Sequence, residues 1–289
     1  MTDVVSVINL KGGVGKTTLT VALAETFAAE FRKGVLVIDL DPQTNATVML
    51  IGESEWSDLN KEGRTLAHVF ERALAGSIGE GSLRSIVVEG ASDVTLPYPG
   101  RIDLVPSSLD LITVEERLHL VPAGPFGAVR PFDVLWRGGK NVIGDYDLVL
   151  IDCPPSLGTI TLNGLRLSRW VLIPTIPDIL STYGIPQIVS RVRRFAEEAD
   201  VVLSPLGIVA TRYRTGLSLH LATVTELRAK HGLDPRNWPR VFRTVIPDGV
   251  AIAKAAERTV YKRTLKQKWD RHAAEFIALA REIAAELER

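Results

Sequence analysis

Short apolar runs recur along the chain and alternate with longer stretches in which apolar residues follow a helical period. A short apolar run bounded by polar residues is typical of a strand buried on both faces of a sheet. The runs that we interpret as strands are Val4–Leu10, Val35–Leu40, Ile102–Pro106, Leu148–Ile151, Trp170–Pro174, Leu206–Ala210 and Val241–Val245.

The stretches between these runs place apolar residues three and four positions apart, as on one face of a helix. The helices expected from this spacing are Thr17–Phe31, Thr65–Leu74, Leu109–Leu120, Leu157–Leu167, Ile185–Ala199, Leu217–His231 and Ala251–Ala256. Strands that alternate with helices indicate an α/β fold, a doubly wound and mostly parallel sheet with helices on both faces. Residues 52–100 are the least regular part, and the Pro- and Gly-rich segment Val121–Pro131 predicts a surface loop.

The chain ends in a further amphipathic pattern, from Arg271 to about Leu287. Two interpretations are open: a membrane-targeting tail, or a helix that packs on the sheet. The polar face of this segment carries both signs of charge and lacks the cationic face of an interfacial helix, which favours packing. No clear linker separates two parts of the chain, so we expect one domain over residues 1–289 with helix 271–287 packed on it.

Candidate chemistry begins directly after the first strand. The run Lys11, Gly12, Gly13, Val14, Gly15, Lys16, Thr17 and Thr18 stands between a strand and a helix, as in a phosphate-binding loop. Glycines let successive N–H groups point at phosphate oxygens, and the helix N-terminus adds a positive dipole end. In such a loop Lys16 reaches the β- and γ-phosphates and the Thr17 hydroxyl ligates Mg²⁺. We therefore expect ATP and Mg²⁺ as ligands.

Acidic residues stand at the ends of two further strands. Asp39 and Asp41 follow Val35–Ile38, and their spacing of two places both on one side of the strand. Asp152 follows Leu148–Ile151 in the manner of a Walker B strand, and we expect it to hold Mg²⁺ through a water. Cys153 comes next and is the single cysteine of the chain, so it predicts a small buried apolar residue and a reducing compartment.

Taken together, these motifs resemble those of the ParA/MinD family of deviant Walker A ATPases, and the chain looks closest to short, Soj-like ParA proteins. The resemblance implies that Lys11 crosses a dimer interface to the partner's nucleotide and that Asp41 positions the attacking water. It implies that Asp39 lies near the Mg²⁺ hydration shell, with switch loops at 42–45 and 154–156. Thr44 stands where the family often has Gly. The adenine contacts that it suggests are Thr211, Arg212, Pro247 and Asp248.

The net charge of zero hides an asymmetry between the two halves of the chain. Residues 1–150 carry 13 Lys and Arg against 20 Asp and Glu, whereas residues 201–271 carry 14 against 5. A basic excess of this kind suggests a face that binds a polyanion. If helix continues through Ala251–Trp269, several of these cations share one face. The candidate DNA contacts are Arg212, Arg214, Arg243, Lys254, Arg258, Lys262, Arg263, Lys266, Lys268 and Arg271.

The resemblance therefore implies an ATPase that dimerises with ATP, binds DNA without sequence preference and hydrolyses ATP slowly when a ParB-like or adaptor partner stimulates it. Its expected task is to partition a plasmid or chromosome centromere complex. Three alternatives are a protein assembly positioned over the nucleoid, a MinD-like membrane-associated ATPase and a non-hydrolysing ATP-gated DNA scaffold. Neither a signal-peptide pattern nor a long apolar run is visible, so we expect a cytoplasmic, nucleoid-associated protein without membrane contact.

Overall fold

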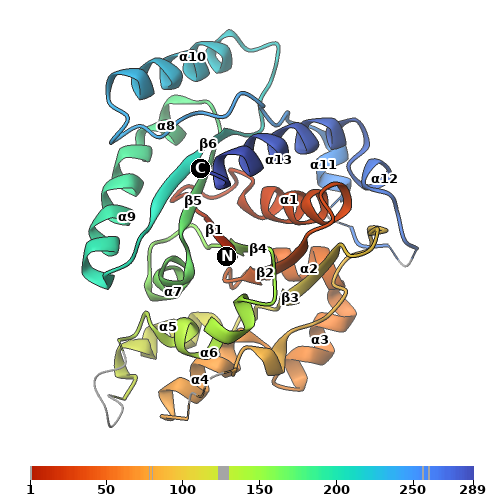
Figure 1. Ribbon diagram of the computed structural model, residues 1–289, viewed down its shortest axis with the longest axis vertical. Coiled ribbons are helices and arrows are strands. Elements are labelled where there is room, and N and C mark those ends of the chain that lie inside the picture. The colour runs from red at the N-terminus through yellow and green to blue at the C-terminus, as the bar shows by residue number, and fades with distance from the viewer. Residues whose placement is uncertain (1, 78, 80, 123–129, 256, 260) are drawn as a thin grey trace.

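The computed structural model describes every residue except 1, 78, 80, 123–129, 256 and 260 (Figure 1). Its described part contains a sheet of six parallel strands in the order β3-β2-β4-β1-β5-β6. The predicted fold class is confirmed. The strands are β1 (Asp3–Val7), β2 (Gly34–Asp39), β3 (Arg101–Val105), β4 (Leu148–Asp152), β5 (Trp170–Thr175) and β6 (Ser204–Ala210).

Helices cover both faces of the sheet, and short 3₁₀ turns occur at Arg84–Ile86, Leu118–Leu120 and Asp270–His272. The helices are α1 (Lys16–Glu30), α2 (Asn45–Ile51), α3 (Glu53–Lys61), α4 (Leu66–Leu74), α5 (Leu111–Arg117), α6 (Val134–Ile143), α7 (Thr159–Leu167), α8 (Ile179–Tyr183), α9 (Ile185–Ala199), α10 (Ser218–Leu233), α11 (Val250–Ala255), α12 (Leu265–Trp269) and α13 (Ala273–Leu287).

Each face of the sheet has its own apolar core, because successive residues of a strand point to opposite sides. On β2, Val35 and Val37 belong to the core beneath α1, α2, α12 and α13, whereas Leu36 and Ile38 belong to the core beneath α4, α6, α7 and α9. Figure 1 shows α1 and α13 side by side on the first face. Among the described residues, no helix is both long enough and apolar enough to span a bilayer.

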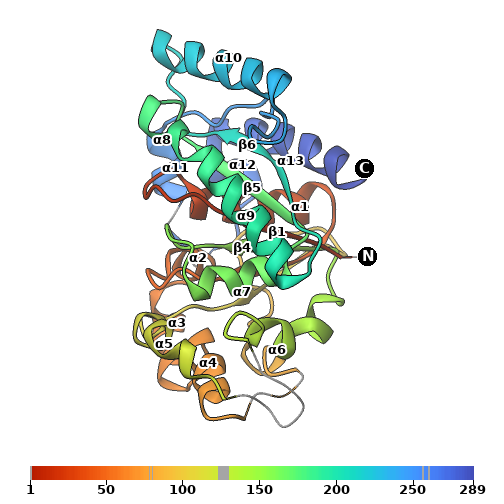
Figure 2. The same ribbon diagram turned by 90° about the vertical axis from the view of Figure 1, so that its left-hand side faces the viewer.

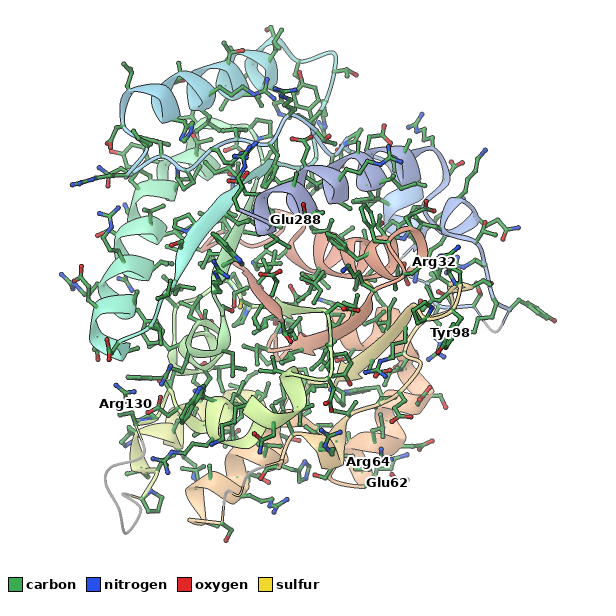
Figure 3. The ribbon with its side chains drawn as sticks, in the orientation of Figure 1. Arg32, Glu62, Arg64, Tyr98, Arg130 and Glu288 are labelled. Atoms are coloured by element: carbon green, nitrogen blue, oxygen red, sulfur yellow. The ribbon has the colours of Figure 1, made fainter. Side chains whose placement is uncertain are left out.

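The molecule is longest along the direction that runs across the sheet. Figures 1 and 2 both show α10 at one end, beyond β6, and α4 and α6 at the other. Charged side chains such as Arg32, Glu62 and Arg64 extend from the periphery (Figure 3). The carboxyl ends of the central strands, β1 and β4, therefore lie about midway along this long axis, where loops from both halves of the chain can meet.

One expected strand, Val241–Val245, does not form. The amide of Phe242 donates to the Ile208 carbonyl at 2.9 Å, which gives an isolated bridge beside β6. The next two amides, of Arg243 and Thr244, donate instead to the Glu282 carboxylate on α13, at 2.7 and 2.9 Å. An acidic side chain thus satisfies the donors that a strand ladder would need.

The expected continuation of helix through Ala251–Trp269 is also wrong. Helix α11 ends at Ala255, and α12 begins only at Leu265, after a capping box in which Thr264 and Gln267 bond each other's backbone amides. The cations of this segment consequently do not share one helical face. Most of the loop expected at Val121–Pro131 lies outside the described residues.

Helices α2, α3, α6 and α8 were not predicted. Helix α3 lies in residues 52–100, the least regular part of the sequence, and α2 ends just before it, whereas α6 contains the pair Gly138–Gly139, which has low helix propensity. A Cβ atom at Gly139 would lie 2.2 Å from Leu83 Cδ1, so close packing explains that glycine. At the end of the chain, α13 packs on α1 and buries Phe276 and Ile283.

Candidate active site

The loop between β1 and α1 has the backbone of a phosphate cradle. Gly13 and Gly15 adopt left-handed φ angles of 73° and 83°, which side chains other than glycine rarely tolerate. A Cβ atom at Gly12 would meet nothing within 4 Å, and helix α1 begins immediately afterwards at Lys16. The loop opens on a cavity of about 610 Å³ that Thr17 and Thr18 also line. Free amides and a helix N-terminus make this cavity suited to anionic phosphates.

Lys16 is buried beneath this loop. Its ammonium lies 3.3 Å from the Asn9 carbonyl oxygen and 3.5 Å from that of Lys11. Burial lowers the pKa of Lys16, and the nearby carboxylates of Asp152 and Asp41 act in the opposite direction. A desolvated ammonium of this kind gains from an anionic partner, which the phosphates of a nucleotide would supply.

Two carboxylates lie side by side at the end of the sheet, because Asp39 and Asp152 are register partners on β2 and β4. Burial raises the pKa of Asp39 to about 7, although hydrogen bonds from Thr47 oppose the shift. Burial and the neighbouring Asp39 raise the pKa of Asp152 well above its usual value, while the Thr17 hydroxyl opposes this. Two buried carboxylates without a cation between them are costly to ionise.

The residues present fit a magnesium ion. Asp152 Oδ2 is buried and has no hydrogen-bond partner, and the Thr17 hydroxyl interacts with the same carboxylate. Within the described residues, no group of three or more His, Cys, Asp and Glu side chains converges on one point. Mg²⁺ commonly takes only one or two protein carboxylates and completes its shell with water and phosphate oxygens, so this donor set suits it.

Asp39 has a second, local task. Its Oδ2 accepts from the amide and hydroxyl of Thr47 at 2.9 and 2.7 Å, and its Oδ1 accepts from the Asp41 amide at 3.1 Å. These bonds fix the loop that carries Asp41, whose Oδ1 accepts from the Gln43 amide and which lines the cavity. Thr44 in this loop adopts a φ of 58°, a conformation that glycine takes at less cost.

The four suggested base contacts come together on the cavity wall. Thr211, Arg212, Pro247 and Asp248 all line it. The Thr211 hydroxyl donates to the Val14 carbonyl at 2.7 Å, and Arg212 Nη1 donates to the Gly13 carbonyl at 3.1 Å. Asp248 in turn pairs with Arg212 and with Arg214, at 3.4 and 2.9 Å. The loop after β6 is thus attached to the phosphate loop.

An apolar wall closes the same cavity and was not predicted. It comes from α1, α2, α11, α13 and the segment before α11, and we define it by the side chains Leu19, Met49, Ile246, Ile252 and Phe276. Helix α2 had no clear sequence signal, and the apolar stripe of α13 indicated burial without indicating a ligand. Only the packing of distant segments reveals this wall.

The Lys11 side chain does not line the nucleotide cavity of its own subunit. Its ammonium contacts Asp178 at 3.3 Å and the Ser181 hydroxyl at 2.8 Å, at the first turn of α8, and its side chain is 40% exposed. Burial acts to raise the pKa of Asp178, but hydrogen bonds from Ser181 and the Lys11 ammonium outweigh it, so this pKa is lowered. The next residues, Ile179 and Leu180, are large apolar side chains that are mostly exposed. Lys11 therefore belongs to a surface rather than to its own phosphate site.

The candidate DNA contacts do not form the expected basic helix face. Lys268 is fully buried between Glu25 and Asp93, which contradicts its prediction as a DNA contact. Arg263 bonds Asp93, Lys262 donates to the Ser92 carbonyl, and Arg258 pairs with Glu55. The residues of the set that stay exposed are Arg212, Arg214, Arg243, Lys254, Lys262, Lys266 and Arg271.

Cys153 is fully buried, and burial followed by the neighbouring Asp152 raises the pKa of its thiol. A thiol that stays protonated and inaccessible is a poor nucleophile and a poor metal ligand. Cys153 is therefore a packing residue behind the site, as its sequence position indicated.

Comparison with known proteins places this geometry in a family. Residues 2–204 match the family model described as an AAA domain. The chain is 29% identical to the sporulation initiation inhibitor protein Soj of Bacillus subtilis (strain 168), over 99% of each chain. It is 31% identical to the chromosome partitioning protein ParA of Caulobacter vibrioides (strain NA1000 / CB15N), over 87% of this chain and 83% of that protein.

Solved structures share this fold. Cobyrinic acid a,c-diamide synthase from Mycobacterium smegmatis, with bound ADP and magnesium, has a TM-score of 0.73 and 26% identity, and the match covers 100% of this chain and 96% of that one. A single-residue variant of McdA from Cyanothece, in complex with ATP, shares the fold, with a TM-score of 0.73 and 19% identity over 99% and 96% of the two chains. On the strength of its phosphate loop, its strand-end carboxylates and these relatives, the chain belongs to the ParA/MinD family of deviant Walker A P-loop ATPases, with Soj and ParA among its relatives.

Proposed function

We propose that this chain hydrolyses magnesium-bound ATP as a face-to-face homodimer. The ATP-bound dimer binds DNA without sequence preference and thereby partitions cargo. The cargo that we propose is a plasmid or chromosome centromere complex. The observation that carries the proposal is the position of Lys11. A lysine that begins the phosphate loop but points to an exposed surface is available to a nucleotide in a second copy. A partner that stimulates hydrolysis and an association with the nucleoid belong to the same proposal.

Within one subunit, the chemistry is divided among few residues. Backbone amides of residues 12–17 and the Lys16 ammonium bind the phosphates, while Thr17 and Asp152 hold the magnesium ion. Bound magnesium would neutralise charge on the phosphate oxygens. Asp41 orients the attacking water, and Asp39 holds the Asp41 loop in place through Thr47. Groups held in place in this way promote hydrolysis by orienting the water and the phosphate and by stabilising the charge that develops in the transition state.

Lys11 supplies what is missing at a single subunit. In the dimer its ammonium leaves Asp178 and approaches the partner's γ-phosphate, where negative charge develops during transfer. Ile179, Leu180 and Tyr183 lie beside it and are mostly exposed, so a second copy would bury them. Hydrolysis removes the γ-phosphate and with it the attraction for Lys11, which couples turnover to dissociation.

Phosphate release measured with the full chain tests the enzymatic part of this proposal. We expect slow release with ATP and Mg²⁺, loss of release with EDTA, and loss in Lys16→Ala. A chain that binds ATP but releases no phosphate, alone or with DNA and a centromere-binding partner, would support the non-hydrolysing scaffold instead. The membrane alternative has little support, because the apolar residues of α13 are buried against α1.

The surface that fits a DNA backbone best is an arginine-rich hollow beside β6, of about 590 Å³. Among its described lining residues, Glu286 is the one carboxylate. The arginines that line the hollow are Arg228, Arg236, Arg240, Arg243 and Arg289. Arg240 and Arg289 pair with Glu286, and Arg228 donates to backbone carbonyls. Exposed guanidinium groups bind phosphates without reading bases, and a dimer would present two such hollows.

DNA retention as a function of salt concentration tests this surface. In Arg236→Gln/Arg243→Gln we expect weaker binding and a salt dependence (log K against log salt) that is shallower by about two units, one for each lost phosphate contact. Lys61→Gln/Arg64→Gln is the matched control, because it removes the same charge at and just after the C-terminal end of α3, far from β6 (Figure 1). Equal slopes in both variants would exclude the hollow from the DNA footprint.

A further inference from the structure

Three charged side chains meet in the interior, away from the active site. Glu25 on α1 and Lys268 on α12 are both fully buried, and their charged atoms lie 2.6 Å apart. Lys268 also lies 2.8 Å from Asp93, which precedes β3. Burial acts to raise the pKa of Asp93, but Lys268 and Arg263 outweigh it and lower this pKa to about 2. We call Glu25, Asp93 and Lys268 the buried ion cluster.

Such a cluster is a poor source of net stability, because the desolvation of buried charges offsets most of their attraction. The cluster instead selects a single packing arrangement of these helices, because a shift of one helix along another would break the hydrogen bonds and ion pairs between the charged side chains. Helices α12 and α13 otherwise meet α1 through apolar side chains, which would tolerate a shift. The cluster therefore fixes α12 and α13 in one position along α1, as Figure 1 shows them, side by side.

The position of α12 and α13 along α1 matters because residues of α1 and of α13 both line the nucleotide cavity. Glu25 lies on the same helix as Lys16, about 14 Å further along the helix axis. Its Oε2 accepts a hydrogen bond of 2.8 Å from Trp269 Nε1, and the Trp269 ring meets Phe276 edge-on with centroids 5.0 Å apart. Phe276 is part of the apolar wall.

A second contact leads to the same wall through α11. Helix α11 touches both α12 and the turn Asp270–His272. His272 is buried against Gly249, where an added Cβ atom would lie 2.6 Å from His272 Nε2. Gly249 and Ile252 line the cavity. The segment that provides Ile252 and Phe276 of the apolar wall is thus attached at α12, and the attachment point is the buried ion cluster.

We propose that the buried ion cluster is a positioning device: it holds the α11 and α13 side of the apolar wall, with Ile252 and Phe276, at the correct distance from the phosphate loop and thereby sets affinity for the base of the nucleotide, while phosphate binding is independent of it. This inference depends on the proposed function only in assuming that the cavity takes a nucleotide. The base is the flat apolar part of ATP, and an apolar wall opposite the phosphate loop is the surface that would receive it.

Calorimetric titration with two ligands, magnesium AMPPNP and magnesium tripolyphosphate, tests the inference. The main variant is Glu25→Leu/Lys268→Met, which leaves Asp93 paired with Arg263 and so leaves no buried charge unpaired. We expect affinity for AMPPNP to fall about tenfold or more, because the wall is no longer held in place. Affinity for tripolyphosphate should stay within about twofold, because only the phosphate loop binds it.

Further variants separate positioning from general destabilisation. Glu25→Gln/Lys268→Met keeps an acceptor for Trp269 Nε1 and should recover part of the AMPPNP affinity. Asp133→Asn/Arg166→Gln removes the ion pairs of Asp133 with Arg166 and Arg130, at 2.8 and 2.7 Å, on the other face of the sheet and should change neither affinity. An equal loss for both ligands, or no loss for AMPPNP, overturns the inference. A wild-type chain that binds neither ligand overturns the proposed function instead.

Discussion

At the scale of single residues, the site depends on side chains that serve their neighbours as well as the ligand. Thr47 is fully buried, donates its hydroxyl proton to Asp39 at 2.7 Å and accepts from the Ser107 amide at 3.0 Å. It thereby connects the Asp41 loop to the start of the segment after β3. No sequence motif marks Thr47, because its hydroxyl joins Asp39, 8 residues earlier, to Ser107, 60 residues later, and only the fold brings the three together.

Thr47→Val should therefore be destabilising although it conserves shape. The substitution removes one of the two donors to Asp39 Oδ2 and leaves the buried Ser107 amide without its acceptor, so we expect a loss of about 1–3 kcal/mol in the free energy of unfolding, together with slower turnover. Urea denaturation measures the first effect. Thr26→Val is the matched control: the Thr26 hydroxyl is equally buried but donates only to the Ala22 carbonyl within α1, so its loss should stay below about 1 kcal/mol. Equal losses in the two variants would contradict this account.

At the scale of elements, the sequence predicted correctly those segments whose structure is decided by residues close together in the chain. The phosphate loop and the acidic strand ends are local in sequence, and the structure brings them together as expected. Val241–Val245 and Ala251–Trp269 were wrong because tertiary partners override local preference there: Glu282 satisfies the amides of the first segment, and the buried ion cluster holds the second. The apolar wall could not be predicted, since it joins segments from both ends of the chain.

Helix α7 provides a test of how tightly an element packs on the sheet behind the site. A Cβ atom at Gly164 would lie 2.7 Å from Leu40 Cδ1 and 3.2 Å from Ile151 Cγ2. Gly164→Ala should therefore lower the free energy of unfolding by about 1–3 kcal/mol through overpacking. Gly144→Ala is the control, because that site is open and has a φ of −61°; its stability should be unchanged or higher by less than about 1 kcal/mol. Thermal melts that rank the two variants in the opposite order would refute the close packing of α7.

At the scale of the whole molecule, the charge asymmetry has two origins. Part of the basic excess in the second half neutralises acidic residues of the first half, as in Lys268 with Glu25 in the interior and Arg258 with Glu55 at the surface. The rest reaches the surface, most densely around the arginine-rich hollow. Composition alone cannot separate internal pairing from a binding face, because both give the same count of charges.

The proposed dimer has a further consequence at this scale: each subunit must contribute its Lys11 to the nucleotide site of the other subunit. Lys11 and Asp41 then act on the same nucleotide from different chains. In a two-fold symmetric dimer, a chain that lacks Lys11 can still hydrolyse ATP if its partner donates one. This exchange is the central claim, and it follows from Lys11 lying at the surface and bonded to α8.

The most direct measurement mixes Lys11→Ala with Asp41→Ala and follows phosphate release. Each variant alone should be inactive. An equimolar mixture should recover about one quarter of wild-type turnover, because half of the dimers are mixed and each of these has one complete site. A mixture that remains as inactive as its components, although light scattering with a non-hydrolysable ATP analogue shows that mixed dimers form, would contradict the exchange of Lys11 between subunits.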